Sequence, residues 1–187
     1  MDVRRFRRAM VIDPVSGLVR RIPLSARMAV YGTSFLAGIL VGLPWLAYRF
    51  DASYPQWHIE IGVYRFLGGI VFTAFLTMYI TCACVLAARG GGAYVEFDPP
   101  RVFVASGPYR LCRNPIASCV VGMLLGEAFA LSSTGVFMLF LAAMPIAHLQ
   151  VILLEEPLLL ERFGAEYEDY RKRVPRWMPR AFWRRSL

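Results

Sequence analysis

Two polar stretches of an otherwise apolar chain carry the residue types that could bind a charged ligand or move a proton. The first is GPYRLCRNP, residues 107–115, and the second is EEPLLLERFGAEYEDYRKRVP, residues 155–175. Guanidinium groups can hold a carboxylate or a phosphate through paired hydrogen bonds, and a carboxylate can accept a proton. The two stretches therefore predict a site for a polar or charged ligand.

Individual residues of these stretches have both functional and structural interpretations. Glu156 is the candidate base for an amine acceptor, and Arg173 is the candidate that orients a carboxylate or phosphate. Asn114 and Pro115 begin a helix, whose amino end is suited to an anion. The alternatives are solvated carboxylates at the membrane interface for Glu155 and Glu156, and a lipid headgroup contact for Arg173.

Four long apolar windows must position the two stretches. They comprise residues 28–48, 66–88, 115–131 and 136–154. About 20 apolar residues cross the hydrocarbon core as a helix, so we predict an all-α polytopic membrane protein with about four transmembrane helices. Only SSTG, residues 132–135, separates the last two windows. They must therefore form an antiparallel hairpin that brings residues 113–115 close to residues 153–180.

The distribution of arginines predicts the orientation. Arginines dominate residues 1–27, residues 89–113 and the tail after residue 154, whereas residues 49–65 are balanced in charge. Because basic segments stay in the cytoplasm, we place both termini and the 89–113 loop there, in a bacterial inner membrane. The first apolar run exceeds the usual length in a signal peptide and is expected to be a retained anchor. The net charge of +8 follows the membrane edges, which favours membrane lipids as partners over nucleic acid.

The tail after the last window has the periodicity of an amphipathic helix. Apolar residues recur three and four positions apart at Leu160, Phe163, Tyr167, Tyr170 and Val174. The opposite face is charged, and Pro175 ends the pattern. We therefore predict a cytoplasmic amphipathic C-terminal helix that folds back over the membrane face, followed by Trp and Arg residues that anchor the chain at the interface.

The four cysteines are expected to be small core residues. Cys82 and Cys84 are two positions apart and point to different faces of a helix, while Cys112 and Cys119 lie at a reducing cytoplasmic edge. We predict no metal site and no disulfide from them.

Other polar or small residues within the windows are expected to be structural. Gly122 and Gly126 form a G-x-x-x-G pair that permits close helix packing. Glu127 is expected to reach water at the outer end of its helix, and His148 and Gln150 to form hydrogen bonds between helices.

The polar motifs resemble those of the isoprenylcysteine carboxyl methyltransferase family, which belongs to a wider group with phospholipid N-methyltransferases. The family pattern is approximately G-x-Y-x-x-x-R-H-P, then E-E, then F-G-x-x-Y-x-x-Y-x-x-R-V-P. The corresponding residues are Gly107, Tyr109, Arg113, Asn114, Pro115, Glu155, Glu156, Phe163, Gly164, Tyr167, Tyr170, Arg173, Val174 and Pro175. The resemblance covers about residues 97–180.

This resemblance implies an integral membrane methyltransferase that uses S-adenosylmethionine, with the cofactor held at the cytoplasmic face. The cofactor-binding residues that it implies are Arg101, Val102, Phe103, Val104, Tyr109, Asn114, Pro115, Ile116, Ala117 and Glu155. The first four would contribute backbone groups. The chain then divides into a basic cytoplasmic segment (1–27), a two-helix membrane part (28–92) and a methyltransferase-like membrane hairpin with the cofactor site (93–187).

Three residues depart from the family pattern and bear on the acceptor. Asn114 stands in place of a histidine, Ala117 in place of a tyrosine, and Val151 in place of an arginine that contacts substrate in the eukaryotic enzymes. The resemblance implies a lipid-like or amphiphilic methyl acceptor, such as a carboxylate. The alternatives are a phospholipid amine, a small thiol, or a non-catalytic membrane scaffold.

Overall fold

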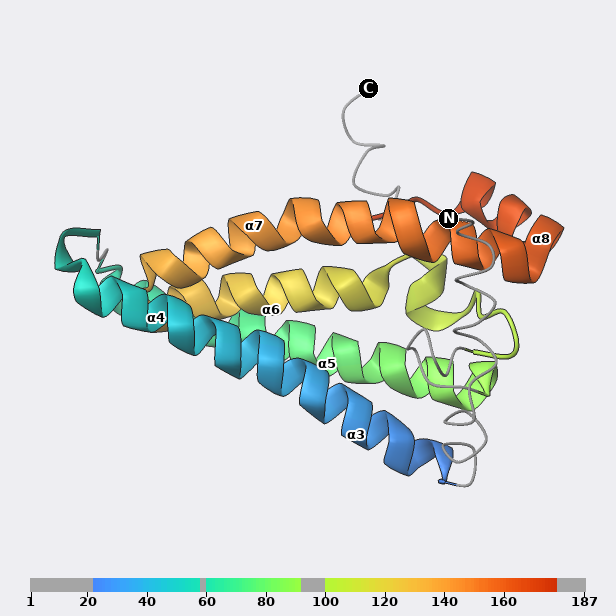
Figure 1. Cartoon of the computed structure of the whole chain (residues 1–187), viewed down its shortest axis with the longest axis horizontal. Coiled ribbons are helices and arrows are strands. Elements are labelled where there is room, and N and C mark those ends of the chain that lie inside the picture. Colours follow the sequence, from blue (N-terminus) through green and yellow to red (C-terminus); the bar gives the residue numbers. More distant parts are fainter. Residues whose placement is uncertain (1–21, 58–59, 92–99, 178–187) are drawn as a thin grey trace, which may run out of the picture.

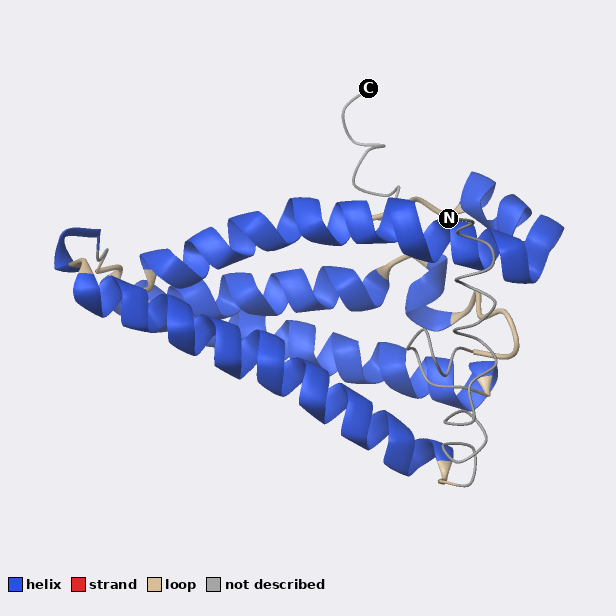
Figure 2. Cartoon of the chain, in the orientation of Figure 1, coloured by secondary structure: helices blue, strands red, loops and turns tan. Residues whose placement is uncertain are grey.

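The structure is a computed structural model, and it describes residues 22–57, 60–91 and 100–177. The first helix comprises α3 (Leu24–Ala37), a π-helical turn (Gly38–Gly42) and α4 (Leu43–Ser53). It is followed by α5 (Arg65–Gly90), α6 (Pro115–Leu131) and α7 (Thr134–Gln150). A second π-helical turn (Val151–Glu155) joins α7 to α8 (Glu156–Arg173). The long helices lie side by side, and the described residues include no strand (Figures 1 and 2).

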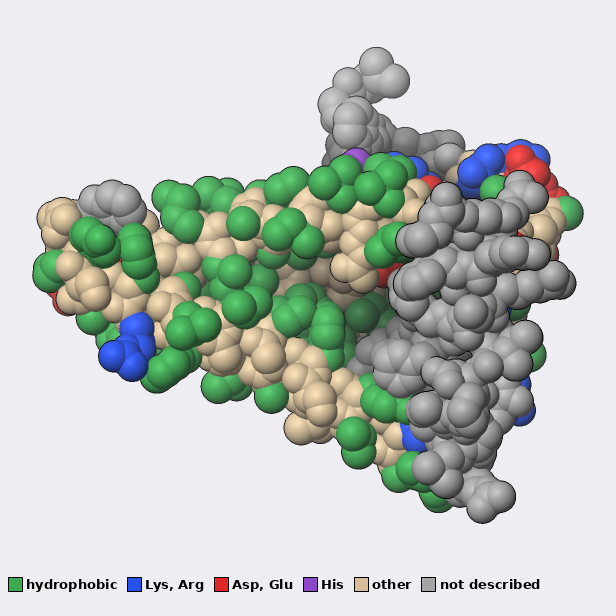
Figure 3. All heavy atoms as spheres, in the orientation of Figure 1, with side chains coloured by type: hydrophobic (Ala, Val, Ile, Leu, Met, Phe, Trp, Pro, Cys, Tyr) green, Lys and Arg blue, Asp and Glu red, His purple; other side chains and the backbone are tan. Residues whose placement is uncertain are grey.

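Three helices are long and apolar enough to cross a membrane. They are Leu24–Ser53, Gly62–Gly90 and Thr134–Arg173, and Pro115–Leu131 is a shorter apolar helix between the last two. Large apolar side chains such as Trp45, Phe66 and Ile146 are exposed, as expected where lipid replaces water. Hydrophobic side chains are spread along the visible face of the long helices (Figure 3). The prediction of an all-α integral membrane protein is therefore confirmed, and each predicted window lies within one of these helices. The cytoplasmic orientation stays a prediction.

Close packing of α5 against α6 sets the centre of the bundle. A Cβ atom added at Gly126 would lie 2.6 Å from the backbone nitrogen of Phe72, and one added at Gly122 would lie 2.5 Å from the ring of Phe75. On the facing helix, a Cβ atom added at Gly68 would lie 2.6 Å from the carbonyl oxygen of Gly126. Glycine is thus required on both helices, and the predicted packing role of the G-x-x-x-G pair is confirmed.

Polar contacts close the end of the bundle where α6 turns into α7, which we call the far end. The buried Asp51 carboxylate accepts hydrogen bonds from the Ser133 hydroxyl and from the Gly135 backbone nitrogen, the latter at 2.8 Å. Arg65 Nε donates to the carbonyl oxygen of Ala130 at 2.9 Å. A carboxylate at the start of α7 and a cation at the end of α6 both suit the helix dipoles. Together they tie the first two helices to the hairpin.

Glu127 is half-buried at this end of α6. Its Oε2 atom is buried and has no hydrogen-bond partner within the described part of the chain, and its expected reach to water stays a prediction. The close approach of α5 encloses this part of α6, which the sequence of α6 alone does not show.

The first helix leaves the hairpin as it runs away from the far end. The α4 segment packs against α7, whereas α3 diverges from α7 (Figure 1). The surface is hollowed between them in the space-filling view (Figure 3). We call the opposite end, where α5 ends and α6 begins, the site end.

The C-terminal helix differs from the predicted tail helix in where it turns. It continues α7 without a break through Glu155, and the change of direction occurs at Gly164, whose φ of 52° and ψ of −125° are not helical. Phe163, Tyr167 and Tyr170 form the part of the predicted apolar stripe that packs against the protein, with Tyr167 and Tyr170 buried and Phe163 half-buried. Leu160, which the same periodicity included, is 36% exposed. The basic segment up to residue 21, the loop 92–99 and the anchor residues from 178 onward lie outside the described residues.

Candidate functional site

The two polar stretches meet at the site end, as the short hairpin predicted. The backbone nitrogen of Arg113 donates to the carbonyl oxygen of Pro175 at 2.9 Å. The side-chain amide of Asn114 donates to the carbonyl oxygen of Arg176 at 3.1 Å. The turn that starts α6 is therefore bound to the segment that follows α8, although the two are far apart in sequence.

A cluster of aromatic side chains also holds the two stretches together at the site end. The Tyr170 hydroxyl donates to the carbonyl oxygen of Tyr109 at 2.6 Å, and both residues are buried. The ring of Phe103 packs on those of Phe163, Tyr167 and Tyr170, with centroid separations of 5.3, 5.9 and 5.0 Å. The apolar stripe predicted for the tail thus serves to seat residues 103–109, which fixes the backbone of the first polar stretch.

Glu156 lies between two arginines. Arg176 forms a bidentate pair with its carboxylate, with Nε–Oε1 and Nη2–Oε2 distances of 2.7 and 3.0 Å. Arg113 Nη1 lies 3.1 Å from the same Oε1 atom, and the side chains of Arg113 and Glu156 are only 10% and 11% exposed. We call these three side chains the charge cluster. It carries one positive charge in excess, because two guanidinium groups share one carboxylate.

The hydrogen bond to Glu156 raises the pKa of Arg176, so this cation stays charged. A carboxylate that already accepts hydrogen bonds from a guanidinium group is stabilised in its ionised form and is a weak base. Glu156 therefore has an observed structural role in joining the two stretches. Its catalytic role stays a prediction.

Three buried donor atoms of the first polar stretch have no hydrogen-bond acceptor among the described residues. They are the Tyr109 hydroxyl, Arg113 Nε and Arg113 Nη1, the last of which contacts Glu156 only as an ion pair. Burial raises the pKa of Tyr109, so its hydroxyl remains protonated and available as a donor. Leaving a buried donor unsatisfied costs about 1–3 kcal/mol. A ligand that offers acceptor atoms to these groups would recover that cost.

Arg173, the predicted orienting residue, is not part of the charge cluster. Its side chain is exposed, and its Nε atom donates to the carbonyl oxygen of Asp169 on the same helix at 3.1 Å. The structure brings Arg113 and Arg176 to Glu156 instead. The break at Gly164 and the end of α8 at Arg173 explain the difference, because they decide which arginine of the tail returns toward α6.

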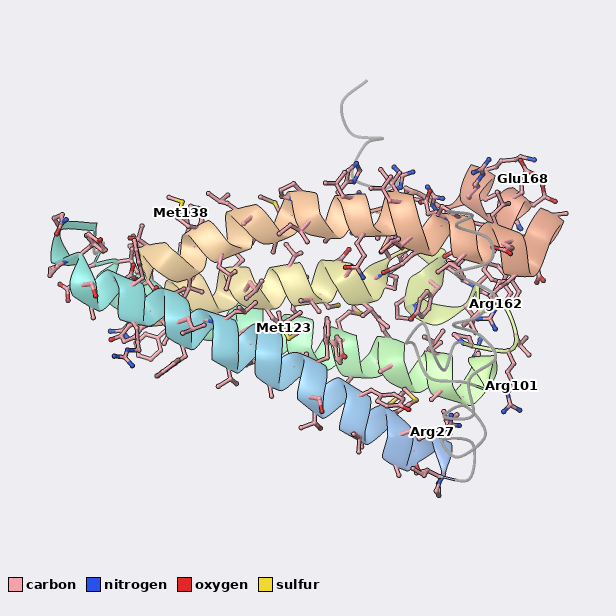
Figure 4. The ribbon with its side chains drawn as sticks, viewed as in Figure 1. Arg27, Arg101, Met123, Met138, Arg162 and Glu168 are labelled. Carbon is pink, nitrogen blue, oxygen red and sulfur yellow. The ribbon has the colours of Figure 1, made fainter. Side chains whose placement is uncertain are left out.

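The predicted backbone contributions of residues 101–104 are partly used within the protein. The backbone nitrogens of Arg101 and Val102 both donate to the carbonyl oxygen of Gly90, at 2.7 and 3.2 Å. These two amide groups therefore already have an acceptor within the protein, and the contribution of residues 101–104 to a cofactor stays a prediction. The physical reason is that the last carbonyl groups of α5 have no partner within the helix. The Arg101 side chain projects outward at the end of α5 (Figure 4), whereas Val104 is buried.

The remaining predicted cofactor residues lie around the start of α6 and the end of α7. Asn114 and Pro115 are buried, and Ile116 and Ala117 are half-buried on the first turn of α6. Glu155 is half-buried and accepts a hydrogen bond from Gln150 at 3.1 Å. The structure thus brings these residues to the same end of the bundle as the charge cluster, without testing their predicted contacts to a cofactor.

Arg113 and Arg176 are the residues that sequence reasoning did not single out. Arg113 belongs to the RNP motif of the first stretch, which marked it as a possible site residue. The many other arginines in and around both stretches gave no reason to choose it over them.

His148 was expected to form a hydrogen bond to another helix. Its Nδ1 atom instead accepts from Trp177 Nε1 at 3.0 Å, which fastens the segment after α8 beside α7.

Two cavities in the described part of the chain lie away from this site. One of about 330 Å³ is apolar and lies between α4 and α7, lined by Ala47, Phe50, Thr134, Gly135, Met138, Leu139 and Ala142. A second of about 260 Å³ is lined by Tyr48, Asp51, Ala52 and Pro55. Both lie toward the far end. The buried unsatisfied donors, which have a specific chemical requirement, identify the candidate site better than cavity volume does.

The sequence of the chain is similar to those of known methyltransferases. The sequence model described as phospholipid methyltransferase matches residues 61–166, more than half of the chain. Methanethiol S-methyltransferase 2 of Bradyrhizobium diazoefficiens is 38% identical over 77 residues, which cover 41% of this chain and 29% of that protein. No solved structure matches.

Two proteins with names that refer to metal resistance are also similar. The cobalt-zinc-cadmium resistance protein CzcN of Cupriavidus metallidurans is 31% identical over 87 residues, covering 46% of this chain and 40% of that protein. The nickel-cobalt-cadmium resistance protein NccN of Alcaligenes xylosoxydans xylosoxydans is 25% identical over 139 residues, covering 65% of each chain. Each of these three alignments spans less than two thirds of the relative's length.

Proposed function

Because the chain belongs to the phospholipid methyltransferase family, we propose that it transfers a methyl group from S-adenosylmethionine to a membrane-associated acceptor. The reaction would occur at the site end, which the arginine distribution assigns to the cytoplasmic face of the inner membrane. The observation that carries the proposal is the charge cluster of Arg113, Glu156 and Arg176, which joins both polar stretches at one end of a membrane bundle.

The donors at this end fit the chemistry of the cofactor. S-adenosylmethionine supplies an activated methyl group on a sulfonium when it is bound. Arg113, with its unsatisfied Nε atom and the excess positive charge around it, would hold the cofactor carboxylate. Glu155 would hold a cationic or hydroxylated edge of the cofactor, and the Asn114–Ala117 turn would contact it.

The residues of the chain would act mainly by orientation. Methyl transfer requires the acceptor atom and the methyl group to be aligned, and holding that alignment supplies much of the rate. Glu156 fixes the directions of Arg113 and Arg176, while Tyr170 fixes the backbone at Tyr109. The exposed apolar faces of the helices would admit an amphiphilic acceptor from the lipid.

The excess positive charge of the cluster favours an acceptor that carries a negative charge over a cationic amine. We therefore place a carboxylate-bearing amphiphile first, because a carboxylate is already a nucleophile and needs no base. A small thiol is the second candidate, and the specific observation in its favour is the similarity to methanethiol S-methyltransferase 2. A phospholipid amine would need Glu156 as a base, against its present ion pairs.

The test uses the full chain in lipid nanodiscs with labelled S-adenosylmethionine. Separate reactions offer a prenylated cysteine with a free carboxylate, methanethiol, or vesicles that contain phosphatidylethanolamine. We expect a labelled, base-labile ester from the first reaction. A labelled thioether or phospholipid instead would move the acceptor to one of the alternatives.

Cofactor binding separates an enzyme from a scaffold. Calorimetry should detect S-adenosylmethionine or S-adenosylhomocysteine binding in the parent, with weaker binding in Arg113→Gln. Lys172→Gln is the matched control, since Lys172 is 64% exposed and pairs with Asp169 on its own helix. The absence of binding by a folded parent would leave the non-catalytic scaffold as the remaining interpretation.

A further inference from the structure

Gln150 and Glu155 are joined by a hydrogen bond that the spacing of an ordinary α-helix disfavours. The side-chain amide nitrogen of Gln150 donates to Glu155 Oε1 at 3.1 Å, across five positions of one continuous helix. Five positions correspond to about 140° around an α-helix, so two such side chains point in different directions. The contact therefore depends on a local change in the helix, and the partner of Gln150 is on its own helix rather than on another.

The local change is the π-helical turn Val151–Glu155. The backbone nitrogen of Glu156 donates to the carbonyl oxygen of Val151, five positions earlier. In this geometry residues five apart lie over one another along the helix, instead of residues four apart. The wider turn thus brings Gln150 and Glu155 to the same side of the helix, directly before the charge cluster begins at Glu156.

A proline follows this turn. Pro157 has no N–H group to donate, and its ring would clash with the carbonyl group four positions earlier in an α-helix. The first helix has the same arrangement, because its π-helical turn Gly38–Gly42 is followed by one residue and then by Pro44. Pro145 lies inside α7 without such a turn, so a proline alone is not sufficient. The ion pairs that hold Glu156 are the second constraint at this position.

We propose that Gln150 is a positioning residue that directs the Glu155 carboxylate toward the cofactor. This inference rests on the proposed function, in which Glu155 holds a cationic or hydroxylated edge of S-adenosylmethionine. The two adjacent carboxylates have different partners, since Glu156 pairs with Arg113 and Arg176. A neutral amide donor fixes the direction of a carboxylate without cancelling its charge. Gln150 therefore leaves Glu155 able to attract a cation.

The register of the helix can be read from pairs of cysteines. The full chain, with its native cysteines replaced, carries Gln150→Cys and Glu155→Cys and is oxidised with copper phenanthroline in detergent. Mass spectrometry then measures the disulfide. We expect this pair to oxidise at least about tenfold faster than Glu166→Cys with Arg171→Cys, which has the same spacing in exposed α-helix. Equal rates would show that no wider turn joins positions 150 and 155, and would overturn the proposal.

Binding of S-adenosylhomocysteine, measured by calorimetry, tests the role itself. Gln150→Met keeps the length of the side chain but removes the donor, and it should weaken binding about fivefold. The same substitution in a Glu155→Ala background should cause no further loss, because Gln150 acts through Glu155. Leu149→Met, at an exposed neighbouring position, is the matched control and should bind like the parent.

The outcomes of the binding experiment separate this inference from the proposed function. If the parent binds and Gln150→Met binds equally well, Gln150 has no positioning role. An equal loss with and without Glu155 would assign Gln150 a general structural role and would also overturn the proposal. A folded parent that does not bind would refute the proposed function, and with it the role of Gln150.

Discussion

Glu156 and Arg176 form a bidentate ion pair that connects the start of α8 to the segment just beyond its end. The two hydrogen bonds measure 2.7 and 3.0 Å. Because Arg113 approaches the same carboxylate from the start of α6, Glu156 joins the first polar stretch both to α8 and to the segment after it.

Arg176→Lys keeps the charge but removes the planar fork that matches a carboxylate. We expect it to lower the free energy of unfolding by about 1–2 kcal/mol and to weaken cofactor binding. Thermal unfolding in detergent and calorimetry with S-adenosylhomocysteine measure the two effects. Lys172→Gln, on the exposed side of α8, is the control and should change neither. An Arg176→Lys protein that matches its parent in both measurements would show that the ion pair does not organise the site.

Arg173→Lys separates the structural assignment from the one based on sequence. The family pattern gives Arg173 the larger role, whereas the structure shows its side chain exposed and bonded to Asp169 of its own helix. We expect Arg173→Lys to change the free energy of unfolding by no more than about 0.5 kcal/mol, as for most surface substitutions, and to retain turnover because its side chain bonds only within its own helix. Turnover on the accepted substrate is compared with that of Arg176→Lys. A larger loss of turnover in Arg173→Lys than in Arg176→Lys would support the role in orienting the acceptor that the sequence predicts for Arg173.

Neighbouring glycines on α5 provide a matched test of helix packing. A Cβ atom at Gly68 would lie 2.6 Å from the carbonyl oxygen of Gly126, whereas one at Gly69 would have no atom within 4 Å. We expect Gly68→Ala to destabilise the protein by about 1–3 kcal/mol through overpacking. Gly69→Ala should be neutral or stabilising by up to about 1 kcal/mol, since alanine favours a helix. Thermal unfolding in detergent measures both, and equal behaviour would contradict the close α5–α6 contact.

The orientation in the membrane can be tested with single cysteines in a chain from which the native cysteines are removed. Arginine asymmetry predicts that Tyr54→Cys faces the periplasm and Lys172→Cys the cytoplasm. An impermeant maleimide applied to intact cells with a permeable outer membrane should label the first and spare the second. Detergent-lysed cells, in which both react, are the control. Labelling of Lys172→Cys in intact cells would place the candidate site on the wrong side for cytoplasmic S-adenosylmethionine.

Periodicity and loop length predicted much of the architecture. The apolar windows located the helices, and the short SSTG link placed Asn114 near the segment after α8, where its amide donates to Arg176. The apolar windows and the short link are local features, so they can be recognised from the sequence without knowing how the helices pack. The pairing of Glu156 with Arg113 and Arg176 depends instead on the break at Gly164 and on how the chain returns after α8.

Long-range packing also explains the other differences. The carbonyl of Gly90 takes the amides of Arg101 and Val102, a contact that only the path of the intervening loop decides. The glycines of α5 and α6 set the register between these two helices, with Gly126 against Phe72 and Gly122 against Phe75. Sequence spacing gives relations within a helix, but not the facing residue on another helix.

The attachment of the first helix has a consequence for how an acceptor would find the site. Asp51 binds this helix to the start of α7 at the far end, while α3 stands apart from α7 toward the site end (Figure 1). An amphiphile already dissolved in the bilayer could approach sideways through that separation. Its search would then be two-dimensional, by lateral diffusion within one leaflet. The rate of encounter would scale with its mole fraction among the lipids, and diluting the membrane with inert lipid would slow turnover at constant total acceptor.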